Sequence, residues 1–162
     1  DGLLAALDRA GLPVRLQIVV SLGEIQDERA VLPLLKIFEE APDIYLREQA
    51  LKALNRFSFD KSPGLASRVG DVMIRYYQSG GPRDRVMAVW SLGKLRIPAA
   101  VPVLTEAASG QGLDLRLAAV EGLANIGAPE TQGLLEKLAA DPDEVVRQAA
   151  RKALERFRPK HD

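Results

Sequence analysis

The sequence contains no cysteine, and its single histidine, His161, lies at the C-terminal end. Without cysteine, the chain forms no disulfide and offers no thiolate to a metal or a substrate. One histidine leaves almost nothing for a histidine-based metal site or for a histidine that activates a serine nucleophile. No glycine-rich loop ending in Gly-Lys-Ser/Thr is present to hold a phosphate. We therefore expect no metal, no cofactor and no enzyme activity.

The chain also lacks net charge, because 22 basic side chains balance 22 acidic ones. This balance argues against a dedicated nucleic-acid binder, whose affinity comes mainly from excess lysine and arginine. No run approaches the roughly 20 apolar residues that a membrane span requires, so we expect no membrane insertion. No basic-then-apolar leader precedes the first residues, and we expect a cytoplasmic protein.

What is present is a repeat anchored on arginine. Five segments align when their arginines are superimposed, with spacings of 32, 38, 31 and 31 residues. A small or branched apolar residue follows each arginine by three positions, leucine by seven, and an apolar residue by ten. These offsets fall on one face of an α-helix. The residue at offset six is small every time, as expected where a second helix approaches closely. The leucines are Leu22, Leu54, Leu92, Leu123 and Leu154.

A short break and a second apolar segment follow the arginine segments, with glycine and proline near the break. Asp43, Asp114 and Asp143 come just before arginine segments, where a carboxylate caps a helix or offsets its N-terminal dipole. No alternating pattern of strand length competes with this interpretation. We therefore predict an all-α fold of stacked antiparallel helix pairs.

These residues resemble the HEAT repeat family, in the short form of the phycobilisome-lyase-type repeats. The resemblance rests on the pattern D-x-x-V-R-x-x-A-x-x-x-L-x-x-[IL]-G, followed by A-V-x-P-L-L. Its closest copy runs through residues 115–127, and the resemblance covers nearly the whole chain. It implies a right-handed α-solenoid, an armadillo-like superhelix. The second repeat departs most from the pattern, because its linker over residues 55–63 is long.

The repeat register predicts the domain organisation. We expect a single domain over residues 1–162, with a partial helix at 2–10, repeats at about 13–40, 43–79, 83–109 and 113–140, and a capping helix at 143–157. The apolar residues after Asp1 align with a second-type helix, which suggests a piece cut from a longer protein. Arg151 replaces the apolar residue of the other repeats at offset four, as expected of a terminal cap.

The repeated arginine has two interpretations, a ligand for anions or a structural row. The family resemblance implies the second, in which each guanidinium donates to loop carbonyls or to an aspartate of an adjacent repeat. The five N–H donors of a planar fork suit that role. The predicted row consists of Arg15, Arg47, Arg85, Arg116 and Arg147.

Residues that break the column rules are candidates for partner binding. Offsets one and five are polar in the second and fifth repeats, but apolar at Leu16 and Val20 in the first and at Val86 and Trp90 in the third. Exposed apolar pairs mark interfaces, so we expect these four side chains to contact a partner. The alternative is that Trp90 fills space beside the irregular second repeat.

Two further surfaces are candidates for partner binding. In the second repeat, Arg68, Arg75 and Tyr77 are expected to be exposed, whereas Tyr76 is expected to be buried. The second helices form the other surface, with Lys36 and Ile37 pointing outward together with Pro33 and Glu40. Its mixed charges fit a protein or peptide better than a phosphate backbone.

The sequence therefore predicts a non-catalytic module of bacterial type that presents a helical surface to a partner protein, a peptide or another domain of its own chain. Two alternatives remain open. One is an accessory subunit of a phycobilisome-lyase-like enzyme that attaches tetrapyrroles. The other is a nucleic-acid-binding HEAT module that uses the basic C-terminal turn, residues 156–160.

Overall fold

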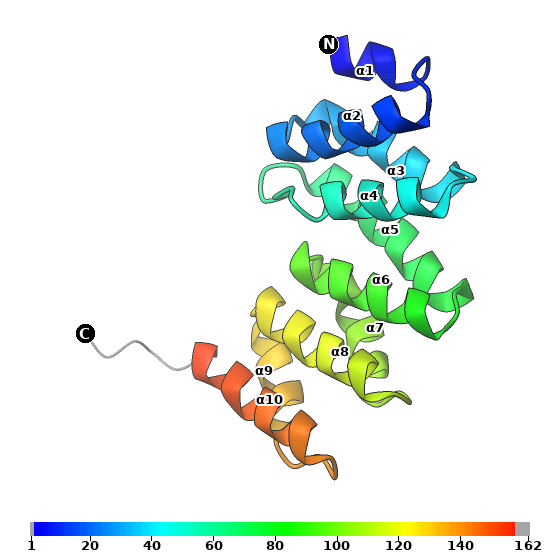
Figure 1. Ribbon diagram of the computed structural model, residues 1–162. Helices are drawn as coiled ribbons and strands as arrows, with labels where there is room; N and C mark the ends of the chain where they lie inside the picture. The colour runs from blue at the N-terminus through cyan, green and yellow to red at the C-terminus, as the bar shows by residue number, and fades with distance from the viewer. Residues whose placement is uncertain (1, 158–162) are drawn as a thin grey trace. The chain divides into compact units, whose positions relative to one another are not determined.

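The computed structural model describes residues 2–157, which form helices joined by short turns and contain no strand (Figure 1). The predicted all-α fold is confirmed. His161 and most of the basic C-terminal turn lie outside the described residues. The α-helices are α1 (Gly2–Leu7), α2 (Leu12–Ile25), α3 (Val31–Glu40), α4 (Ile44–Leu54), α5 (Pro63–Ser79), α6 (Pro82–Lys94), α7 (Val101–Ala108), α8 (Leu113–Ile126), α9 (Pro129–Leu138) and α10 (Glu144–Leu154).

The even-numbered helices carry the repeated arginines, and we call them the arginine helices; the odd-numbered ones are the second helices. The Asp43 carboxylate accepts the Leu46 N–H at 2.7 Å and caps α4, and Asp143 accepts the Val145 N–H at 2.8 Å and caps α10. Asp114 lies in the first turn of α8, where its charge faces the helix dipole. Among residues 2–157, no helix is long and apolar enough to cross a membrane.

The chain divides into two compact units, Asp1–Leu65 and Ala66–Asp162. In the first unit, α2 and α3 both pack against α4. The columns at offsets three and seven form its core, since Ile18, Leu22, Ala50 and Leu54 are all buried. The linker after α4 folds inward as well, with the rings of Phe57 and Phe59 stacked 6.3 Å apart.

In the second unit, α8 is the central helix and contacts α6, α7, α9 and α10. The same columns supply its core, because Ala88, Leu92, Ala119 and Leu123 have no solvent exposure. Whether the two units make up the single predicted domain, with the repeat boundaries given above, stays a prediction.

The column at offset ten contains one wrong prediction. Ile25 is 59% exposed, whereas Phe57 and Leu95 at the same offset are both 6% exposed. α4 ends at Leu54 and α6 at Lys94, so the chain leaves the helix before offset ten and turns the apolar side chain inward. α2 continues to Ile25, which therefore stays on the surface of the helix end.

Successive arginine helices touch through their backbones at small residues. A Cβ atom placed on Gly23 of α2 would lie 2.7 Å from Ala53 Cα of α4, and one placed on Gly93 of α6 would overlap Gly122 Cα of α8. Ala53 and Gly122 belong to the small column at offset six, so the close approach predicted there is present. Any side chain at Gly93 must push two helices apart.

We predict that Gly93→Ala lowers the free energy of unfolding by about 1–3 kcal/mol, because its methyl group overlaps backbone that has no space to move. The matched control is Gly133→Ala in α9, where an added Cβ meets nothing within 4 Å. That substitution should raise the free energy of unfolding by up to about 1 kcal/mol, because alanine favours helix. Urea denaturation of both variants measures the difference, and equal effects would contradict the close approach.

Candidate functional site

Four arginines of the row donate to backbone carbonyls in the last turn of the preceding second helix or in the turn that follows it. Carbonyls there lack a partner within the helix, so an arginine side chain satisfies them. The bonds run from Arg47 Nε to Phe38 O (2.7 Å), Arg85 Nε to Gly80 O (3.2 Å), Arg116 Nε to Ala108 O (3.3 Å) and Arg147 Nη1 to Asp141 O (2.7 Å). Each arginine thus joins the end of one helix to the start of the next, as expected of a structural row.

Arg116 also forms an ion pair with Asp141, which lies in the turn that follows α9. The Arg116 side chain is 18% exposed and that of Asp141 is 10% exposed. The hydrogen bond from Arg116, together with one from the Asp143 N–H, lowers the pKa of the Asp141 carboxyl. The pair connects two successive repeats, which is the second role that the resemblance implies for the row.

Arg15 is the exception in the row. Its Nε is buried and has no hydrogen-bond partner among the described residues. The preceding helix, α1, ends at Leu7. The chain then turns, with the Arg9 and Ala10 N–H groups both donating to Ala6 O. No carbonyl at the end of α1 reaches the Arg15 guanidinium.

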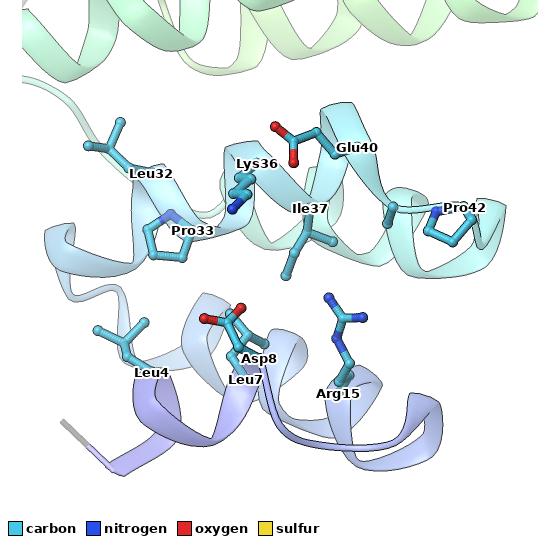
Figure 2. Close-up of a pocket in the computed structure, with 11 residues that line it drawn as sticks. Leu4, Leu7, Asp8, Arg15, Leu32, Pro33, Lys36, Ile37, Glu40 and Pro42 are labelled. Carbon is cyan, nitrogen blue, oxygen red and sulfur yellow. The ribbon is translucent and has the colours of Figure 1, made fainter.

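The Arg15 guanidinium instead lines a groove of about 520 Å³ between α1 and α3, which we call the α1–α3 groove (Figure 2). Leu4, Leu32 and Pro33 lie toward one end of the groove, and Arg15 and Pro42 lie toward the other. Leu7, Asp8, Lys36, Ile37, Glu40 and Ala41 complete the lining. All four residues predicted to point outward from the second helix of the first repeat therefore line this groove.

One of those four differs from the prediction. Ile37 is 6% exposed, so its expected outward orientation is wrong. Figure 2 shows the reason: the Ile37 side chain points from α3 toward the arginine helix, with Arg15 across from it. Lys36, one position earlier, is exposed as predicted.

The charged side chains of the α1–α3 groove line one hollow and are unpaired. Within residues 2–157, the side chains of Asp8, Arg15, Lys36 and Glu40 take part in no hydrogen bond or ion pair. Two cations and two carboxylates thus face one hollow beside apolar walls. The sequence analysis did not select Asp8; the signal was its position after Leu4 and Leu7 in a segment of the second-helix type.

A second hollow, of about 670 Å³, lies in the other unit, and we call it the α6–α8 pocket. Tyr77, Arg85, Val86 and Glu106 line it, together with residues 110–115. The Tyr77 hydroxyl donates to Glu106 Oε1 at 3.1 Å, and the Arg85 guanidinium lies 5.7 Å from the centre of the Tyr77 ring. Burial, together with the neighbouring Glu106, raises the pKa of Tyr77. Tyr77, Arg85 and Glu106 thus partner one another in this pocket, whereas the side chains of Gln111 and Asp114, which also line it, have no partner among the described residues.

The predicted exposure of the two tyrosines is wrong. Tyr77 is 5% exposed, whereas Tyr76 is half-buried and donates its hydroxyl to Asp84 Oδ1 at 2.6 Å. On α5 the buried face follows Val69, Met73 and Tyr77 at steps of four residues. The sequence-based prediction therefore placed the buried face of α5 one residue away from its true position.

The structure distributes the other predicted partner-binding residues over several surfaces. Trp90 is 46% exposed, and the Lys94 ammonium lies 5.4 Å from the centre of its ring. Val86 lines the α6–α8 pocket, which Trp90 does not. Arg68 and Arg75 are exposed on α5, and Leu16 and Val20 are half-buried on α2. Leu16 and Val20 belong to the first unit, and the other four residues belong to the second.

Exposed apolar side chains that the sequence did not single out lie at the starts of two arginine helices in the first unit. Leu12 and Val14 on α2 are 42% and 56% exposed, and Ile44 and Tyr45 on α4 are 71% and 57% exposed. The available signal was apolar residues in a first helical turn. No group of three or more potential metal ligands occurs within the described part of the chain.

Stacked helix pairs joined by a row of arginines define an all-α solenoid. The chain belongs to the HEAT repeat family: the model for HEAT repeats matches residues 71–155, and that for the PBS lyase HEAT-like repeat matches residues 14–40. No curated protein matches the chain.

Solved structures of designed armadillo repeat proteins are similar to this one. The structure of YIII(Dq.V1)4CPAF in complex with peptide (KR)4 shares the fold, with a TM-score of 0.64 at 19% identity over 96% of this chain and 80% of that one. Another, YIII(Dq)4CqI, has a TM-score of 0.41 at 14% identity over 97% and 99% of the two chains.

For the row, we predict that Arg116→Ala lowers the free energy of unfolding by about 1–3 kcal/mol, because buried acceptors lose their donor.

Asp141→Asn should also destabilise the protein at pH 7, because it removes the carboxylate of the ion pair. A lowered pKa contributes stability that is present above the ordinary value of 3.8 and is lost as the pH falls through the folded-state value. The deficit of Asp141→Asn should therefore shrink in acid.

Urea denaturation between pH 7 and pH 3 (about the range over which carboxyls titrate) measures this loss. The matched control is Asp71→Asn on α5, where the carboxylate is exposed and has no partner among the described residues. A deficit of Asp141→Asn that stays constant with pH would contradict the ion pair.

The exposure of Trp90 predicts that its fluorescence is quenched by acrylamide and that its emission lies at the long wavelengths of a hydrated indole. Trp90 is the only tryptophan, so the signal has one source. Lys94→Met should alter the emission by removing the ammonium that lies over the ring. A blue-shifted, unquenched emission would instead show a buried ring.

Proposed function

We propose that the chain is a non-catalytic binding module that holds a segment of a partner protein in the α1–α3 groove. The observation that carries the proposal is the set of unpaired charges there, since Asp8, Arg15, Lys36 and Glu40 face the groove without partners. A ligand with polar groups of both signs satisfies them, and apolar side chains of that ligand cover Leu4 and Leu32.

A polypeptide has this combination of groups. Its backbone supplies N–H donors for carboxylates and C=O acceptors for cations at every residue, and its side chains supply apolar area. A nucleic acid fits less well, because its phosphates need an excess of cations and the groove balances two cations with two carboxylates. The volume of about 520 Å³ lies within the range typical of ligand sites.

The armadillo neighbour supports the proposal at the level of fold. Its structure contains a bound peptide, (KR)4, so a helical repeat protein of similar fold accepts a peptide. Each helix pair of a solenoid packs on its neighbours, and the stacked repeats present the surfaces that such proteins use for binding.

The test is selection from a peptide library displayed on phage, followed by fluorescence polarisation with the enriched peptides. We predict that Lys36→Glu weakens binding by about tenfold or more, since it reverses a charge that a backbone carbonyl contacts. Lys137→Glu on α9 is the matched control, an exposed lysine outside the groove, and should leave binding unchanged.

Three outcomes would contradict the proposal. Enriched peptides that bind both variants equally would place the binding surface elsewhere. Absorbance shifts of an added bilin, with no peptide selected, would favour the tetrapyrrole-lyase accessory role. Binding to DNA with a steep dependence on salt would favour a nucleic-acid module.

A further inference from the structure

The arginine row shows which kind of atom belongs beside Arg15. At the four other positions the guanidinium donates to a backbone carbonyl oxygen, 2.7–3.3 Å away. At Arg15 the same donor is buried, and no oxygen accepts from it. A buried N–H without an acceptor is unfavourable. The same guanidinium lines the α1–α3 groove, so an oxygen of a ligand in the groove can accept from it, as the carbonyl oxygens do at the other four positions.

We propose that the α1–α3 groove binds the C-terminal end of a partner polypeptide and that Arg15 binds its terminal carboxylate. This inference rests on the proposed function and names its ligand. A guanidinium presents parallel N–H groups that match the two oxygens of a carboxylate, and such charge-assisted bonds are stronger than bonds to a neutral carbonyl. The Arg15 side chain has neither a carboxylate nor a carbonyl partner among the described residues.

The position of Arg15 favours the end of a polypeptide over an acidic side chain within one. Figure 2 shows Arg15 toward one end of the groove, beside Pro42, with Leu4, Leu32 and Pro33 toward the other. A peptide that terminates at Arg15 extends its preceding residues along the groove toward the apolar end. Its last side chain then lies against Ile37, which faces Arg15.

The remaining charges fit the backbone of such a peptide. Asp8 and Lys36 lie on opposite walls, on the segment after α1 and on α3, between the two ends of the groove. The Asp8 carboxylate is an acceptor for a backbone N–H, and the Lys36 ammonium is a donor for a backbone carbonyl. The carboxylate of Glu40 points away from Arg15 in Figure 2, which leaves the guanidinium as the group that meets the terminal charge.

The experiment compares two arrays of the same octapeptides on the wild-type protein, one with free C-terminal carboxylates and one with C-terminal amides. Amidation should weaken binding by about tenfold to a hundredfold, because a charge-assisted bond is lost. Arg15→Gln should abolish the preference for the free carboxylate, and Arg9→Gln, an exposed arginine outside the groove, should preserve it. Because Arg15 has no partner to lose, Arg15→Gln should keep the thermal stability of the wild type.

Each contrary result has a distinct meaning. Equal binding of amides and free carboxylates, with the Lys36→Glu effect intact, would overturn the carboxylate inference and leave the proposed function standing. Amidated peptides selected for an internal aspartate or glutamate would show that a side-chain carboxylate is the ligand and would also overturn it. A carboxylate preference that survives in Arg15→Gln would exclude Arg15 as its source. Failure of every peptide to bind would remove the proposed function as well.

Discussion

The contact between successive arginine helices is the constraint on which the rest of the structure depends. At Gly93 and Gly122 the helices approach until only hydrogen atoms fit between their backbones, and at Gly23 a single methyl group, that of Ala53, faces the glycine. This spacing brings the leucine and alanine columns of neighbouring helices into full contact, so residues such as Leu92 and Leu123 lose all solvent exposure. Larger residues at these points would open the core of the unit in which they lie.

The arginine row addresses a different problem, the unsatisfied carbonyls at helix ends. Solenoids contain many helix ends for their length. Here an arginine of the next helix donates to a carbonyl at or just after the end of α3, α5, α7 and α9. No carbonyl at the end of α1 reaches Arg15, and the buried Nε of Arg15, beside the α1–α3 groove, therefore has no acceptor among the described residues. The repeated arginine thus satisfies a carbonyl at four positions and has no acceptor at the fifth.

The fold was predictable because residues of the same type recur at fixed positions in every repeat. Arginine, small residues and leucine at fixed offsets specify helix, face and neighbour, which are local or nearest-neighbour properties. Orientation within a face was less predictable: Tyr77 and Ile37 were each assigned one position away from their true side, since about 100° of rotation separates consecutive helical residues. The unpartnered Arg15 in the groove could not be predicted. The residues around Arg15 match the repeat pattern, and only the structure shows that no carbonyl of the described residues lies within reach of its side chain.

The linker after α4 carries an implication for how such arrays diversify. It breaks the repeat length, yet its two stacked phenylalanine rings hold it against its own unit. An inserted segment whose own aromatic side chains are buried does not disturb the register of the repeats on either side. Lineages of this architecture can therefore gain or exchange surface segments at such joints while the helical frame is inherited unchanged.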